Sequence, residues 1–170
     1  MPRLMFPGTG RIKWCTTITS KSAPAITEIN AGVELTTWLR QDGINRSLSP
    51  NETDVADATD TFNKTDVGTF GAACELTFLR DSVTASDTAF ATLQRGTRGY
   101  LVVAPFGFGT GAGTTAGPVA GAAATAGNRV EVWPAVVSAA GAEAEGPNKA
   151  QVFKVTFALP DSPNINATAA

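Results

Sequence analysis

The sequence contains no histidine, the residue that proteins use most often as a general base and as a metal ligand. Serine, threonine and cysteine are present as nucleophiles, but none of them has a histidine to activate it. No two acidic residues stand out from the other surface acids as a catalytic carboxylate pair. We therefore predict that the chain is not an enzyme.

Nucleotide-binding and metal-binding motifs are also missing. The letters GAGTTA at 111–116 match the pattern G-x-G-x-x-A, but Gly117, Pro118 and Gly121 follow where a dinucleotide site needs a helix. The repeat of Asp54, Asp57 and Asp60 at every third residue does not fit a calcium loop of the EF type. We expect no cofactor and no metal.

Cysteines are few, and long apolar runs are absent. Cys15 and Cys74 lie in strand-like segments, which predicts small buried thiols, with a disulfide or a reactive thiol as the alternative. No apolar run approaches the roughly 20 residues of a membrane helix. The first residues, MPRLMFPGTGRIKW, lack the apolar core of a signal peptide. We expect no membrane contact.

Charge is scarce as well. Charged residues make up 16% of the chain, compared with about 25% in a typical soluble domain. The net charge of −2 gives no global electrostatic basis for binding nucleic acid. A neutral surface suits a protein that covers its outside with copies of itself.

The charges that are present are unevenly distributed. Residues 1–27 contain only basic charges, namely Arg3, Arg11, Lys13 and Lys21. Residues 41–70 are mainly acidic, with Asp42, Glu52, Asp54, Asp57, Asp60 and Asp66 against Arg46 and Lys64. A basic arm and an acidic loop can meet head to tail between copies. Two independently solvated segments are the simpler alternative.

Most of the remaining sequence is typical of β-structure. Strand composition and alternation occur at 11–18, 33–40, 72–81, 99–108, 128–139 and 149–159. The spacing of apolar residues predicts a helix over 86–95, capped by Thr84 or Ser86 and ended by Gly96. Residues 22–32 predict one or two helical turns that end at a left-handed Gly32, and Asp42-Gly43 predicts a turn.

These elements predict one β domain over residues 11–160. The proline- and glycine-rich residues 1–10 are expected to form an extended arm, and 161–170 a flexible tail. The polar segment 44–70 and the Gly/Ala-rich segment 107–127 are predicted to be long loops.

The run PAITEINAGVELTTWLRQDG, residues 24–43, resembles the N-terminal signature of tail tube proteins, also called major tail proteins. These proteins come from long-tailed, siphovirus-type phages of actinobacteria. The resemblance rests on Pro24, on the turn Glu28–Gly32, on Leu35-Thr36 and on Asp42-Gly43. The order and lengths of the later segments agree over most of residues 11–160.

The resemblance implies a mainly β, tail-tube-type sandwich or barrel with one flanking α-helix, a long inter-ring loop and extended termini. It also implies self-assembly into hexameric rings that stack into the phage tail tube, the conduit for DNA ejection. The implied partners are other copies, a tape measure protein, and tail terminator and baseplate proteins. Double-stranded DNA would pass without specific binding. The location would be the virion tail, assembled in the cytoplasm of the bacterial host.

A DNA channel should not attract phosphates, so lumen-facing acids should outnumber basic residues. Glu34, Glu75 and Glu131 lie within predicted strands and are the candidates, with an ordinary solvated strand face as the alternative. Trp38 shares a predicted face with Glu34 and Arg40, so it is either an inter-subunit contact or a core residue. The candidate inter-subunit contacts are Arg3, Arg11, Lys13, Trp38, Asp54, Asp57 and Asp60.

Two other classes of protein fit the same pattern of strands. One is another phage virion sandwich, such as a tail terminator or a capsid decoration protein. The other is a monomeric carbohydrate-binding or adhesin-type sandwich. Only a tube protein should form long open cylinders.

Overall fold

The computed structural model describes residues 6–57, 59, 61–62, 64–112, 121–143, 146 and 149–170. Its strands are β1 (Arg11–Cys15), β2 (Val33–Glu34), β3 (Leu39–Asp54), β4 (Thr65–Leu79), β5 (Arg98–Ala104), β6 (Arg129–Glu143), β7 (Val152–Ala158) and β8 (Asn164–Thr168). Its helices are short: α1 (Phe6–Thr9), α2 (Ile26–Ala31) and α3 (Thr88–Thr92). The predicted mainly β fold is confirmed.

All eight strands belong to one antiparallel sheet in the order β2-β1-β5-β6-β7-β4-β3, and β8 also pairs with β6. The strands β2 and β3 lie at opposite ends of this order, yet only residues 35–38 separate them in the sequence. So short a connection spans at most about 18 Å. Leu35 N donates to Ile12 O of β1, and Leu79 N of β4 donates to Trp38 O. The sheet therefore curls until its two ends meet.

Two hydrophobic clusters lie on the two faces of this sheet. The inner core fills the curled sheet and contains Trp14, Phe78, Trp133 and Phe153, among others. The outer core covers the opposite face of β1, β5 and β6 and contains Ile29, Phe108 and Ala167, among others. In β5, Leu101 and Val103 face the inner core whereas Val102 and Ala104 face the outer one. Burial of both faces explains the continuous apolar run at 101–104.

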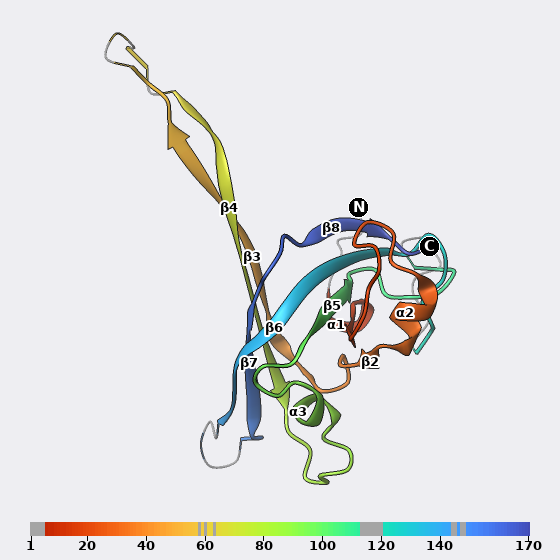
Figure 1. Ribbon diagram of the computed structural model, residues 1–170. Coiled ribbons are helices and arrows are strands. Elements are labelled where there is room, and N and C mark those ends of the chain that lie inside the picture. The colour runs from red at the N-terminus through yellow and green to blue at the C-terminus, as the bar shows by residue number, and fades with distance from the viewer. Residues whose placement is uncertain are drawn as a thin grey trace.

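Each of two helices packs on one core. α3 is shorter than the predicted helix 86–95, and its N-cap is Asp87. Its Ala89 and the following Leu93 are buried in the inner core, at the end of the sheet remote from the projecting hairpin (Figure 1). α2 confirms the predicted helical turns and buries Ile29 in the outer core.

Gly32 after α2 is not left-handed, because its φ is −65°. A Cβ there would lie 2.6 Å from Cys15 Sγ, so close packing against β1 is what requires glycine.

The prediction of a loop over 44–70 is wrong. This segment forms most of β3 and the first part of β4, which pair as one long hairpin that projects from the body (Figure 1). Both of its faces are largely exposed, so it lacks the apolar alternation that identifies a strand.

The predicted strand 33–40 is interrupted, because residues 36–38 form a turn. The predicted Asp42-Gly43 turn instead lies inside β3, where the register with β4 shifts between Leu39 and Ile44. A Cβ on Gly43 would lie 2.2 Å from Thr77 O, so glycine allows the two strands to approach there.

The predictions for the chain ends also need correction. Residues 161–170 are not a free tail, because β8 pairs with β6 and both Ala167 and Ala169 are buried. Within the arm 1–10, residues 6–9 form α1, and residues 1–5 lie outside the described part.

The Gly/Ala-rich segment 107–127 is described on both sides of residues 113–120. Asn128 joins the two parts: its Oδ1 accepts from Gly109 N at 3.1 Å and Thr125 N at 3.0 Å, and its Nδ2 donates to Gly109 O at 3.0 Å. These described parts are therefore fixed to the start of β6.

Candidate assembly surface

The outer half of the β3–β4 hairpin is largely exposed, and of its described residues only 69–72 lie beside another part of the chain, residues 159–163. Every residue of β3 from 47 to 54 is exposed. Its large apolar side chains are exposed too, with Val67 at 90% and Phe70 at 54%. A two-stranded hairpin alone is at best marginally stable in water. This surface is therefore suited to contact with another protein chain.

The end of the hairpin carries acidic groups on an exposed turn. Asp54 closes β3 and accepts a hydrogen bond from Ala56 N at 3.0 Å, and Asp57 accepts one from Thr59 N at 2.8 Å. Glu52 and Asp66 lie next to this turn on the two strands. The predicted contacts Asp54 and Asp57 thus share one exposed tip, whereas Asp60 and Arg3 lie outside the described residues.

An ion pair fixes the hairpin where it leaves the body. Arg46 of β3 pairs with Glu131 of β6, and Trp133 Nε1 donates to the same carboxylate at 3.0 Å. Both charged side chains are mostly buried, at 21% and 16% exposure. β3 and β6 are not neighbours in the sheet, so the pair bridges the curled sheet at the mouth of the inner core. We call this contact the hairpin brace.

Glu131→Gln should destabilise the fold by about 2 kcal/mol, since it removes the ion pair between Glu131 and Arg46 in a partly buried place. Arg40→Met is the matched control: the Arg40–Asp42 pair is more exposed, at 35% and 71%, so its loss should cost under about 1 kcal/mol. Urea unfolding of both variants measures the difference. Equal losses of unfolding free energy in the two variants would show that the brace is an ordinary surface ion pair.

The three predicted lumen acids differ in their surroundings. Glu131 is neutralised by Arg46 in the brace. Glu34 is half-buried and accepts hydrogen bonds from the backbone N–H and the hydroxyl of Thr36. Glu75 is half-buried on β4, between Asn45 of β3 and Thr156 of β7. Burial chiefly raises the pKa of Cys74, and Glu131 and Glu75 both lie near enough to raise it further, whereas Glu34 lies opposite Lys13 of β1.

The predicted basic contacts Arg11 and Lys13 lie together on β1. They line a cavity of about 660 Å³ with Asn30, Glu34, Thr36, Thr37 and residues 121–123. Lys13 is only 8% exposed, and its Nζ lies 5.4 Å from the centroid of the Phe108 ring. We call this place the basic cavity. Trp38 is elsewhere: it is half-buried and packs against the inner core.

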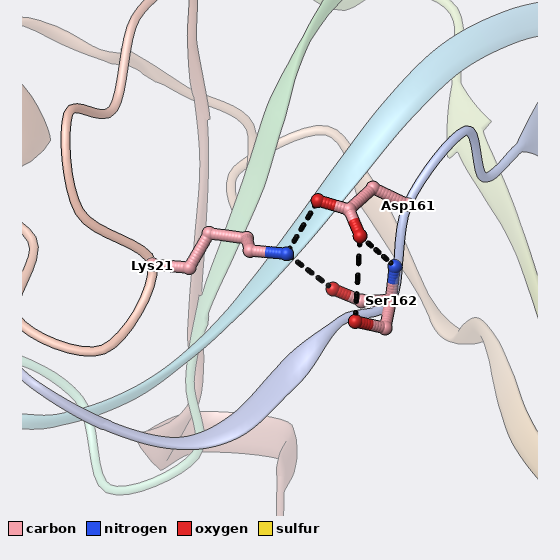
Figure 2. Close-up of polar contacts among 3 residues, drawn as sticks. All are labelled: Lys21, Asp161 and Ser162. Carbon is pink, nitrogen blue, oxygen red and sulfur yellow. Dashed lines mark hydrogen bonds and ion pairs between the residues drawn. The ribbon is translucent and has the colours of Figure 1, made fainter.

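The C-terminal segment is fastened to the N-terminal third of the chain. Figure 2 shows Lys21 reaching the carboxylate of Asp161 and the carbonyl oxygen of Ser162, the latter at 3.1 Å. The hydrogen bond from Lys21 lowers the pKa of Asp161. Nearby, Ile26 N donates to Ala170 O and Ala170 N donates to Pro24 O, both at 3.0 Å. These contacts hold β8 over the outer core.

Both cysteines are free and buried, as predicted for structural thiols. Cys15 belongs to the outer core and Cys74 to the inner core, so they lie on opposite faces of the sheet. Burial raises the pKa of Cys15 to about 11 and that of Cys74 to about 12.

At pH 8 a thiol-reactive reagent should therefore label neither cysteine of the folded protein and both cysteines in urea. The free energy of unfolding should fall as the pH rises above about 9, where the unfolded thiols ionise and the folded ones keep their protons. Labelling rates and urea titrations at pH 7 to 10 measure both effects. Rapid labelling of the folded chain would contradict the burial.

Several of these contacts were not predicted from the sequence. The partners of the brace and of the Lys21–Asp161 pair are 85 and 140 residues apart. Among the described residues, no group of three potential metal ligands occurs. No helix within the described ranges is long and apolar enough to cross a membrane.

An exposed projecting hairpin on a curled antiparallel sheet is suited to a subunit that contacts other chains. The whole chain, residues 1–170, matches the family model described as phage tail tube protein, and the chain belongs to that family. It is thus a structural component of a virion tail, of a family that assembles into tubes.

Other comparisons add little. A solved structure titled "Crystal structure of Hcp protein" aligns at 13% identity over 88% of this chain and 87% of that chain, with a TM-score of 0.36. No curated protein sequence matches.

Proposed function

We propose that copies of this chain form hexameric rings that stack into the tail tube of a long-tailed phage, and that DNA passes through the bore during ejection. Membership of the tail tube family supports the formation of a tube. The exposed hairpin supports the proposal of how neighbouring copies join. That hairpin exposes Leu48, Val67 and Phe70 and leaves the outer edge of β3 without a strand partner among the described residues.

The outer edge of β3 is the place where a neighbouring copy adds a strand. An unpaired edge offers a row of backbone N–H and C=O groups to another chain. Pro50 has no N–H to donate, and the β3–β4 register shifts between Pro50 and Glu52. We therefore assign the shared pairing to residues 44–49, which include the brace residue Arg46 and end before Pro50.

The distribution of charge supports a head-to-tail contact. The hairpin end is acidic, whereas Arg11, Lys13 and Lys21 lie on the body. A contact between two different surfaces closes into a ring or continues as a stack, as a tube requires. The number of six subunits comes from the resemblance to tail tube proteins of actinobacterial phages.

The bore should be neutral or negative, so that DNA slides without releasing counter-ions. Glu34 and Glu75 remain the candidates for acidic side chains that face the bore and give it negative charge. Glu131 contributes little, because Arg46 neutralises it. Tape measure, terminator and baseplate proteins are the further partners, and assembly takes place in the host cytoplasm.

Concentrated pure protein should form long hollow cylinders, visible by negative-stain electron microscopy and sedimenting far faster than the monomer. Single closed rings would favour a terminator-type role. Stable monomers that bind glycans would overturn the proposal in favour of a carbohydrate-binding module.

A further inference from the structure

We propose that the basic cavity is the receptor for the acidic hairpin end of a second copy, with Asp54 placed against Arg11 and Lys13. This inference rests on the proposed function, since it needs an assembly in which one subunit's hairpin reaches another's body. It adds to the proposed function the identity of the two surfaces that meet.

Lys13 is the strongest sign of a missing partner. It is only 8% exposed, its Nζ lies over the Phe108 ring, and Glu34 stands opposite it on β2 without forming an ion pair with it. A buried ammonium normally pairs with an acid or donates several hydrogen bonds. Neither a hydrogen bond nor an ion pair links Lys13 to the rest of the described chain. Its charge is thus available to an incoming anion.

The cavity around Lys13 is chemically suited to a carboxylate. Arg11 lies two residues along β1, so both side chains leave the same face of the strand. Arg11 donates one hydrogen bond, to the carbonyl oxygen of the adjacent Gly10, which leaves other guanidinium donors for a ligand. The one acid in the lining, Glu34, already accepts two hydrogen bonds from Thr36. Two cations against one satisfied carboxylate leave the cavity positive.

The end of the hairpin supplies an exposed carboxylate that can match the positive cavity. Asp54 stands at the end of β3, exposed, beside Glu52 and Asp66. Antiparallel strands rise about 3.4 Å per residue, so Asp54 lies roughly 27 Å beyond Arg46 at the brace. A projection of that length holds the hairpin end away from its own body (Figure 1). Its own chain therefore does not compete for the cavity.

The first test reverses one charge on each side. Arg11→Glu and Asp54→Arg should each raise the critical concentration for tube formation at least tenfold. The double variant Arg11→Glu/Asp54→Arg should bring the critical concentration most of the way back to the wild-type value. Tenfold corresponds to about 1.4 kcal/mol. Both residues are at least partly exposed, and circular dichroism of the monomer checks that each variant folds.

The matched control is Arg95→Glu, which reverses an exposed arginine outside the cavity. It should leave the critical concentration within about twofold of the wild-type value. It changes the net charge by the same amount as Arg11→Glu but does not alter the cavity. If Arg95→Glu weakens assembly as much as Arg11→Glu, or if the double variant assembles no better than the single ones, the receptor assignment is wrong while the tube stands. If the wild type builds no tube at all, the proposed function fails first.

Discussion

Replacing residues 49–71 with Asn-Gly should abolish tube formation and leave the body folded. Leu48 and Ala72 face each other across the hairpin, so a two-residue turn can join β3 to β4 there. Among the described residues of the deleted segment, none belongs to the buried core. The shortened chain keeps residues 44–48 but loses Phe70, Val67 and the acidic end, and with them the proposed contact between the hairpin end and a second copy.

Electron microscopy and sedimentation measure the loss of tubes, and urea unfolding measures the body. We expect monomers with an unfolding free energy within about 1 kcal/mol of the wild type, because surface changes usually have small effects. The matched control is Phe62→Ser, which alters one exposed residue near the hairpin end and keeps both strands. Long cylinders from the shortened chain would refute the assembly role of the hairpin.

Trp14→Ala should have the largest effect on stability, a loss of about 3–5 kcal/mol. Trp14 is 1% exposed and stacks on Phe157, with ring centroids 5.8 Å apart. Gly99 makes room for it, since a Cβ there would lie 2.8 Å from the Trp14 ring. A domain is typically stable by about 5–15 kcal/mol, so the variant should be only marginally folded at 37 °C.

Phe62→Ala is the control for Trp14→Ala, because Phe62 is 77% exposed and its truncation should cost less than about 0.5 kcal/mol. Urea unfolding compares the two variants. A loss below about 1 kcal/mol for Trp14→Ala would mean that the inner core is not the main source of stability.

The sequence predicted the strands that bury at least one face. β1, β5, β6 and β7 were found because their apolar residues recur or run continuously, and α2 and α3 because of their apolar spacing. The hairpin was missed because both of its faces meet solvent, which removes the periodic signal. β8 was missed because Asn164–Thr168 has one large apolar residue, Ile165, and is held by pairing with β6.

The candidate site was predicted only in part. The contrast between basic residues 1–27 and acidic residues 41–70 was visible as composition. The brace between Arg46 and Glu131 was not visible in the sequence, because only the curl of the sheet brings β3 close to β6. The same curl pairs Glu131, a candidate lumen-facing acid, with Arg46, which the sequence did not indicate.

The central claim is that another copy completes the open edge of β3. A cryo-electron microscopy map of the assembled protein tests it most directly. We predict continuous backbone hydrogen bonding between residues 44–49 and a strand of an adjacent subunit. A tube in which that edge faces solvent, with each subunit's sheet complete by itself, would contradict the account.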